Sequence, residues 1–314
     1  MGDLVLRGLD AANLLGYLAA LGTLRSATLV WPEVTAKMDW TMIDGMWRPR
    51  LLTKIVLDPR ELVTGLAKQL SSSAHLNALN LSNDLTISVE AFRGALLQVQ
   101  QHTIAAERRD ADFLAAFGSD AVEARDNGKP NGQIADTAFR TMSGAGHQHF
   151  LSTMRAFVTD TNPEHLEKAL FRPWQYDDPL ENHSMRWDPM DDIRYALRWD
   201  NPSGDKSRKT GGSMWGANRL AIEALPLFPV FPVNNRLETT GFTEKGRASP
   251  IRLTWPVWSG AIGLDSLRSL LASPELQEVV PNRRYLHARG IVEVFRCERI
   301  TQGKYRNFST ALPV

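Results

Sequence analysis

Apolar residues recur at helical spacing close to the start of the chain. They are Leu14, Leu15, Leu18, Leu21 and Leu24. This spacing predicts a helix, which Asp10 or Asn13 can cap through a side-chain oxygen. Small residues lie between the leucines and would let another backbone come close; they are Gly16, Ala19, Ala20 and Gly22.

The next stretch changes from helical spacing to strict alternation. Met38, Trp40 and Met42 alternate with polar residues, "DG" follows at 44–45, and apolar residues resume with Trp47. An Asp-Gly pair between alternating segments is typical of a tight β-hairpin. We therefore expect a Trp-bearing strand pair directly after the first helix.

The middle of the chain is mainly helical in pattern. Apolar residues recur mainly at helical spacing from residue 59 to 118. The polar stretch "EARDNGKPNGQ" that follows at 123–133 is read as a loop. A short helix is expected after "SGAG" at 143–146. Another begins at "NPEHLEKALF", where Asn162 caps and Pro163 occupies the first turn.

Residues 173–214 show little periodicity and are rich in Trp, Pro and Asp. Such a segment is too long for an ordinary connection, so it is either functional or ordered by a partner. A helix over "SMWGANRLAIEALPLF" is ended by Pro226 and Pro229, and "IRLTWPVWSG" reads as a strand. A helix at "GLDSLRSLLAS" and a last strand pair around "GIVEVFRCERI" complete the pattern.

The order of these elements predicts an α+β fold, with mixed helices, antiparallel strand pairs and long irregular loops rich in Trp, Pro and Gly. Strands and helices do not alternate regularly, which argues against Rossmann and TIM architectures. No internal repeat is visible. We divide the chain into an N-terminal α+β portion, 1–172, and a C-terminal α+β portion, 173–314, which holds a basic loop and basic terminal strands.

Composition narrows the class of protein. The chain has 314 residues, 43% of them hydrophobic, with 36 Lys and Arg against 35 Asp and Glu. No long apolar window and no signal-peptide pattern is visible, so we expect a cytoplasmic protein that does not enter a membrane. Cys297 is the single cysteine, which excludes an internal disulfide and a thiolate metal site. We expect no cofactor.

The stretch "LVLRGLDAANLLGYLAALGTLR", followed by the Trp-bearing hairpin, resembles the N-terminal signature of one known family. This is the large subunit of CRISPR type I-G (formerly I-U) Cascade interference complexes, in which "LxxYLxALGxLR" leads into a Trp-containing strand pair. The matching residues are Gly8, Leu14, Tyr17, Leu18, Ala20, Leu21, Gly22, Leu24 and Arg25. "DDIRYALRWDNPS" and "GANRLAIEALPLFPV" also look like the shorter members of this family.

The resemblance implies a non-catalytic subunit of a guide-RNA surveillance complex. Such a subunit inspects a short motif (PAM) beside the target in double-stranded DNA, stabilises duplex opening and the R-loop, and helps to recruit a separate helicase-nuclease. Its implied partners are the guide crRNA, the target DNA, the helicase-nuclease, and the backbone and guide-end-capping subunits of the complex. Guide pairing reads the target sequence, while protein reads the short duplex motif and the backbone.

Positive charge is concentrated in the segment "DNPSGDKSRKTGGSMWGANRL" at 200–220. Four basic residues stand there against Asp200 and Asp205, and glycines permit close backbone approach. We expect DNA-phosphate contacts from Lys206, Arg208, Lys209 and Arg219, with Trp215 packing at the base of the loop. The alternative is a solvated surface loop. The segment lacks the Gly-Lys-Ser/Thr ending of a nucleotide-binding loop.

The polar stretch "DNGKPNGQ" at 126–133 is rich in donors and acceptors. Candidate motif-reading residues, able to bond base edges or phosphates, are Asn127, Lys129, Asn131 and Gln133. The alternative interpretation is an ordinary interhelical loop.

The C-terminal run 283–306 holds seven basic residues against Glu293 and Glu298. Residues of one parity share a face of a strand, so these cations are divided between two faces. We expect RNA or subunit contacts from Arg283, Arg284, Arg296, Lys304 and Arg306. A solvated edge strand protected by charge is the alternative.

Carboxylates gather at 177–192, where Arg186 is the only cation; they are Asp177, Asp178, Glu181, Asp188, Asp191 and Asp192. They could bind a divalent cation and serve a metal-dependent nuclease. The other interpretation is that they pair with basic residues of 200–219 or of a partner. His147, His149 and Ser143 in "MSGAGHQHF" lack a recognisable set of metal ligands or a catalytic triad. A guide-RNA-binding scaffold is a third hypothesis, consistent with the same basic segments.

Overall fold

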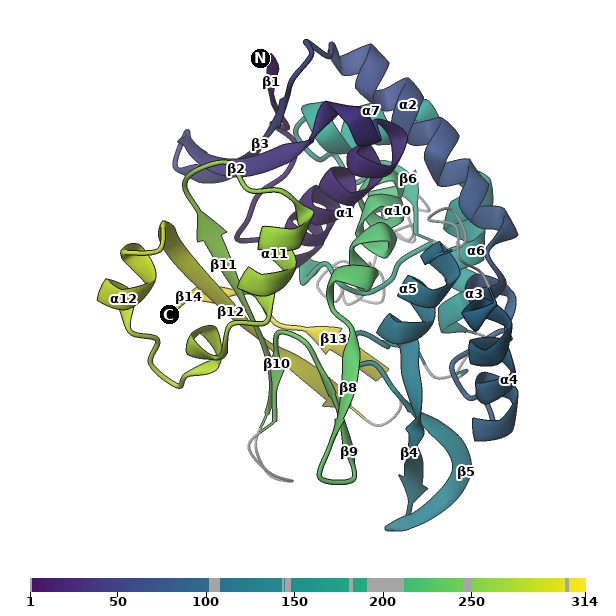
Figure 1. Ribbon diagram of the computed structural model, residues 1–314. Helices are drawn as coiled ribbons and strands as arrows, with labels where there is room; N and C mark the ends of the chain where they lie inside the picture. Colours follow the sequence, from purple (N-terminus) through teal and green to yellow (C-terminus); the bar gives the residue numbers. More distant parts are fainter. Residues whose placement is uncertain are drawn as a thin grey trace, which may run out of the picture.

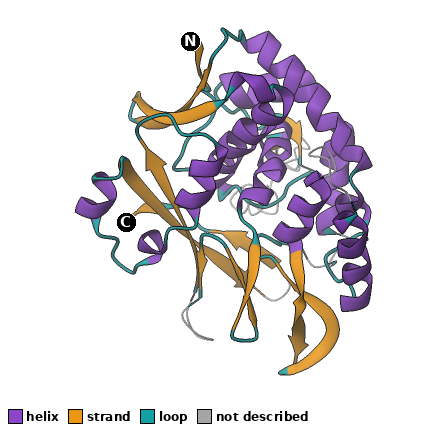
Figure 2. Cartoon of the chain, viewed as in Figure 1, coloured by secondary structure: helices purple, strands orange, loops and turns teal. Residues whose placement is uncertain are grey.

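The computed structural model describes residues 2–101, 108–142, 144, 148–180, 183–190, 212–244, 250–302 and 305–314. The fold is α+β, as expected. Helices gather on one side, while antiparallel sheets and hairpins occupy the other side and one end (Figures 1 and 2). Two of the helices, α1 (Leu14–Val30) and α10 (Trp215–Ala224), cross the middle.

Helix α1 is the buried centre of the protein, and all its residues from Leu14 to Ala27 are buried. A helix that is apolar on every side belongs inside a core. Asn13 caps it, as one of the two expected candidates, by accepting a hydrogen bond from the Gly16 amide. Gly22 of α1 lies against the backbone of Leu220, so α1 packs closely on α10.

Shorter helices surround this pair; they are α2 (Pro59–Ser71), α3 (Asn77–Asn80), α4 (Val89–Gln100), α5 (Arg108–Phe117), α6 (Phe150–Asp160) and α7 (Pro163–Phe171). A 3-10 turn, η2 (Ser72–His75), continues α2. Asp58 and Glu61 form a capping box at the start of α2. Asn162 caps α7 with Pro163 in its first turn, which confirms that prediction. The helix expected after "SGAG" is α6.

A three-stranded antiparallel sheet holds β1 (Gly2–Val5), β3 (Met46–Thr53) and β2 (Lys37–Ile43) in that order. The predicted hairpin joins β2 to β3, and its turn residues Asp44 and Gly45 both have positive φ. A larger sheet has the order β10 (Phe242–Thr243), β11 (Ile251–Trp258), β12 (Ile291–Gln302), β13 (Tyr305–Phe308), with β14 (Leu312–Pro313) paired to β12. The expected C-terminal strand pair lies within it.

Smaller elements complete the fold; they are η1 (Pro32–Val34), β6 (Asp178–Pro179), β7 (Gly212–Ser213), η4 (Leu225–Leu227), α11 (Leu264–Leu271), η5 (Pro274–Gln277) and α12 (Arg283–His287). Helix α12 and η5 cover a small second core of Leu276, Leu286, Ile291 and Val294. No described helix is both long and apolar enough to cross a bilayer.

Aromatic side chains join the two ends of the chain. Tyr17 stacks on Trp40 with ring centroids 5.5 Å apart and also contacts Trp255. Trp255 and Trp258 of β11 donate hydrogen bonds to the carbonyls of Ala11 and Met38. The main core includes residues from Leu6 to Ala311, so a boundary at residue 172 does not divide it into two cores.

The polar stretch 123–133, read as a loop from the sequence, is instead part of a β-hairpin. Strand β4 (Gly118–Asp126) pairs with β5 (Lys129–Asp136), and Asn127 and Gly128 form the turn with φ of 49° and 81°. Two consecutive left-handed residues are what a tight two-residue hairpin requires. The Asn-Gly pair was the local signal for it.

Candidate nucleic-acid interface

Two β-hairpins project from one end of the protein (Figure 1). The first is β4–β5. The second pairs β8 (Val230–Val233) with β9 (Arg236–Thr239). Strand β4 contacts both β8 and β9, so the hairpins lie side by side. A two-stranded β-ribbon has the width to enter the DNA major groove.

The four candidate motif-reading residues all lie on the β4–β5 hairpin. Asn127, Lys129 and Asn131 are exposed, whereas Gln133 is half-buried. Asn131 accepts a hydrogen bond from the Gln133 amide through its side-chain oxygen, which orients the Asn131 amide group. At the base of the hairpin, Ile134 donates its amide to Ile87 and anchors the strand to the core. The base of the hairpin is therefore fixed to the core, and the hairpin presents oriented polar groups beyond it.

The second hairpin was missed by the sequence analysis. Its turn is Asn234-Asn235, with φ of 47° and 62°, and Arg236 follows with an exposed side chain. Phe231 on β8 is 43% exposed. The pair "NN" between short apolar runs was the available signal, because asparagine tolerates left-handed backbone better than most residues.

Charges on the two hairpins are mixed. Lys129 and Arg236 lie exposed near the tips, but Glu123, Asp126 and Glu238 are exposed as well. Glu123 accepts a hydrogen bond from the Gly132 amide. Because affinity for DNA backbone scales with neutralised phosphates, these hairpins alone would bind duplex weakly. Their exposed amides are better suited to contacts with base edges.

The expected phosphate contacts at 200–220 divide into two groups. Lys206, Arg208 and Lys209 lie outside the described residues. Arg219 is described, and its placement corrects the expectation. It is 1% exposed, in α10, and it forms an ion pair with Glu223 at 3.0 Å. Its guanidinium faces the protein interior and does not reach a surface where phosphate could bind.

Trp215 begins α10 and is half-buried. Its indole nitrogen donates to the carbonyl of Pro179, and its backbone amide donates to Asp178. The ring stacks on His183 with centroids 4.2 Å apart. Trp215 therefore anchors the start of α10, the helix that follows the basic loop in sequence.

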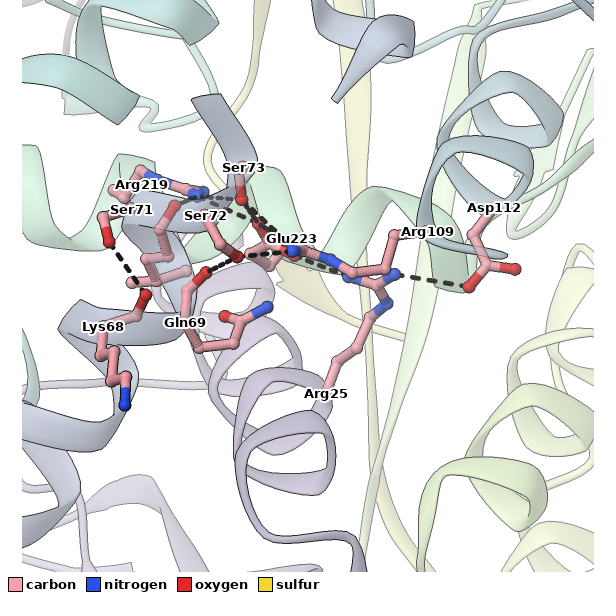
Figure 3. A network of polar contacts seen from close by, with 11 residues as sticks. Arg25, Lys68, Gln69, Ser71, Ser72, Ser73, Arg109, Asp112, Arg219 and Glu223 are labelled. Atoms are coloured by element: carbon pink, nitrogen blue, oxygen red, sulfur yellow. Dashed lines mark hydrogen bonds and ion pairs between the residues drawn. The ribbon is translucent and has the colours of Figure 1, made fainter. Parts of the chain in front are cut away.

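Arg219 belongs to a buried network that joins α1, η2, α5 and α10 (Figure 3). Glu223 is fully buried and accepts hydrogen bonds from Arg25 at 2.6 Å and from Ser73 at 2.8 Å. Arg109 lies 3.3 Å from the same carboxylate. Burial alone would raise the pKa of Glu223, but the three guanidinium groups and Ser73 hold it down to about 2. Sequence reasoning did not find this network.

Helix α12 carries Arg283 and Arg284, two of the five predicted RNA or subunit contacts. Arg283 is paired with Glu293, and Arg284 is exposed. Arg306 is half-buried and donates to the carbonyl of Arg140. Lys304 lies outside the described residues.

Arg296 serves an internal role that corrects its assignment as a contact residue. Its guanidinium donates to Thr254 and to the carbonyls of Leu276, Glu278 and Val279. These bonds fasten the segment after η5 to the sheet. With its donors committed in this way, Arg296 has little capacity left for an external phosphate.

The described acidic residues of 177–192 do not form a metal site. Asp177 pairs with Lys168, Asp178 accepts from the Trp215 amide, and Asp188 accepts from Asn13. No group of three His, Cys, Asp or Glu within the described ranges is arranged to hold a metal ion. Glu181, Asp191 and Asp192 lie outside those ranges, as do His147 and Ser143. His149 is described and lies 3.8 Å from Asp84.

Residues of the N-terminal signature are packing residues. Tyr17 stacks in the core, Arg25 binds Glu223, and a Cβ on Gly8 would lie 2.2 Å from the carbonyl of Ala169. The signature therefore specifies how α1 packs on its neighbours. No protein-family model, curated protein or solved structure matches the chain.

Proposed function

We propose that this protein is a non-catalytic, DNA-binding subunit of a guide-RNA CRISPR surveillance complex, in which the two projecting hairpins inspect a short motif in duplex DNA. The observation that carries the proposal is the pair of adjacent hairpins with exposed asparagine tips. The N-terminal resemblance supplies the type of complex. Guide crRNA, backbone and guide-end-capping subunits, and the helicase-nuclease are the proposed partners, with cytoplasm as the compartment.

The geometry favours recognition of bases over tight binding to backbone. Asn127 and Asn234 are at the hairpin tips, and each offers a side-chain donor and acceptor that can pair with an adenine edge. Lys129 and Arg236 each lie two residues further along the chain and can neutralise the flanking phosphates. Few phosphate contacts give weak binding to free duplex, so motif inspection takes place in the assembled complex.

The first experiment is co-purification of the tagged chain with its genomic neighbours and sequencing of the bound RNA. A repeat-derived guide RNA is expected. A monomer that associates with no RNA and no neighbouring protein would contradict the proposal. Crosslinking then separates the two roles: contact with target DNA supports motif inspection, and contact with guide RNA alone would indicate a scaffold.

The second experiment measures binding of the complex to duplexes with randomised bases beside the target. Asn127→Gly and Asn234→Gly remove the amide groups while keeping a residue that adopts positive φ. If these residues read bases, preference at one position falls by about 1–3 kcal/mol, roughly 5- to 150-fold. Lys129→Ala should weaken binding to duplexes of every sequence by the same factor, and it should reduce the salt dependence of the binding affinity.

Lys54→Ala is the matched control, because Lys54 is an exposed lysine directly after β3, and β3 lies at the opposite end of the protein from the two hairpins (Figure 1). It should leave both affinity and motif preference unchanged. Unchanged preference in both Asn127→Gly and Asn234→Gly would contradict the assignment of the hairpins, even in a complex that binds guide RNA normally.

A further inference from the structure

Two consecutive valines are exposed on the surface between η5 and α12. Val280 is 83% exposed and Val279 is 56% exposed. Within the described ranges, no other large hydrophobic side chain is as exposed as Val280. Single apolar side chains on a surface are ordinary, whereas adjoining ones are typical of a surface that meets another molecule.

The backbone of this segment is fastened to the rest of the protein. The Arg296 guanidinium donates hydrogen bonds to the carbonyls of Glu278 at 2.6 Å and of Val279 at 2.9 Å. Directly after the valines, Pro281 is buried and Asn282 caps α12. Since the chain is held on both sides, the two valine side chains are presented to solvent at a fixed position.

A third exposed aliphatic side chain lies on the same face. Leu312 of β14 is 66% exposed and is the direct cross-strand neighbour of Arg296. Val314, two residues further on, packs against the second core, which α12 and η5 cover (Figure 1). Residues two apart along a strand share a face of the sheet, so Leu312 lies on the side of η5 and α12. Leu312 and Val279 therefore both adjoin the Arg296 side chain.

Two charged side chains next to the valines have no counterpart in the described part of the chain. Glu278 and Arg284 are exposed, and neither side chain forms an ion pair or a hydrogen bond there. Nearby charged side chains do have partners: Arg283 pairs with Glu293, Arg252 pairs with Glu298, Arg289 lies over the Tyr285 ring, and Glu275 accepts from the Tyr285 hydroxyl. One free anion and one free cation beside an apolar centre are complementary to a second copy turned by a two-fold axis, because each Glu278 then meets Arg284 of the other copy.

Nucleic acid fits this face poorly. Arg283 is occupied by Glu293 and Arg296 by backbone carbonyls, which leaves Arg284 as the cation beside the valines that could neutralise a phosphate. A nucleic-acid strand would also leave the valines in water and bring phosphates close to Glu278. The face is better suited to protein.

We propose that this face, formed by Glu278, Val279, Val280, Arg284 and Leu312, is a two-fold contact between two copies of the chain. The aliphatic side chains pack at its centre, and the two Glu278–Arg284 pairs close it on both sides. The face is small, so the dimer is weak and exchanges with the monomer. The inference does not depend on the proposed function, because it concerns the chain alone.

Sedimentation equilibrium of the purified chain, over concentrations from about 2 to 200 µM, tests for the dimer. The mean mass should rise from one chain towards two. Val280→Asp places a charge at the centre and should raise the dimer Kd about tenfold or more. Val56→Asp is the matched control, because Val56 is 78% exposed but lies between β3 and α2, outside this face. It should leave the dimer Kd unchanged.

A wild-type chain that stays monomeric over the whole range would overturn the proposal. That holds even if another protein covers the face in a complex, since the face would then belong to that protein. Equal weakening by Val280→Asp and Val56→Asp would also count against it, because the effect would not be specific to this face.

Charge reversal tests the two-fold geometry. Glu278→Arg and Arg284→Glu each bring like charges together twice in a dimer, so each variant alone should dimerise about tenfold more weakly. An equal mixture of the two variants should recover wild-type association, because both contacts between unlike chains then join opposite charges. A mixture that associates no better than its components, or a wild-type dimer that none of these substitutions weakens, would overturn the proposal.

Discussion

Gly22 of α1 lies against the backbone of Leu220 in α10, so closely that a Cβ on Gly22 would sit 1.8 Å from the Leu220 carbonyl oxygen. No rotamer change can relieve a clash with backbone. The two central helices of the protein, nearly 200 residues apart in sequence, can approach this closely because the contact position is a glycine.

Gly22→Ala should therefore separate α1 from α10 and lower the free energy of unfolding by about 2 kcal/mol or more. Chemical denaturation measures the loss. Gly94→Ala is the matched control, since Gly94 is also in a helix but a Cβ there meets no atom within 4 Å. That variant should gain up to about 1 kcal/mol from helix propensity. Equal effects at both positions would contradict the close packing.

Stability should fall in acid through Glu223. Its pKa is about 2 in the folded protein, against 4.5 for an unperturbed glutamate. A lowered folded-state pKa stabilises the protein above the unfolded value, and this stabilisation is lost as pH falls from about 5 towards 2. The full contribution is on the order of 3 kcal/mol.

Urea denaturation at a series of pH values tests this dependence. Glu223→Gln should be less stable than wild type at pH 7 and should show a flatter loss between pH 5 and pH 3, because the titrating group is gone. Parallel curves for the two proteins would show that Glu223 is not held as a carboxylate by its arginines.

The turn of the β4–β5 hairpin depends on residues that accept positive φ. Asn127→Gly should keep the hairpin, whereas Asn127→Val should open it, because a β-branched side chain clashes in the left-handed region. Hydrogen exchange provides the measurement. Amides of β4 and β5 should exchange faster in Asn127→Val, while those of α1 stay protected. Unchanged exchange in the hairpin would argue against this turn.

Cys297 should be inert in the folded protein. It is buried in β12, and burial raises the pKa of its thiol well above the usual range. The thiolate is the reactive form, so a thiol reagent at pH 8 should label the native protein very slowly and the guanidinium-unfolded protein at once. Rapid native labelling would mean that the β11–β12 pairing opens readily.

Local signals in the sequence predicted much of the secondary structure correctly. Asn13 before the first helix, Asp44-Gly45 in the hairpin, and Asn162-Pro163 at α7 each act through their immediate neighbours. Their effect depends on backbone dihedral angles and on amides of residues adjacent in sequence, so it does not require contacts with distant parts of the chain. The α+β class followed from the order of these elements.

The same kind of signal was present at Asn127-Gly128 and at Asn234-Asn235 but was not recognised. The strand residues around Asn127 are polar on both faces, so no alternation of apolar and polar residues predicts the strands. These strands persist because their bases are anchored to the core, for example through Ile134 and Ile87, and because the two hairpins contact one another. Such support comes from tertiary contacts.

Local sequence was sufficient to locate turns and helix caps, and it showed a single cysteine and a nearly balanced overall charge. Which of the charged side chains are buried depends instead on contacts between distant parts of the chain. Arg219 reads as one more cation beside a basic loop, yet it lies in the core because Glu223 follows one helical turn later and Ser73 comes from 146 residues away. A guanidinium can leave water only where distant parts of the chain converge to replace its hydrogen bonds and balance its charge.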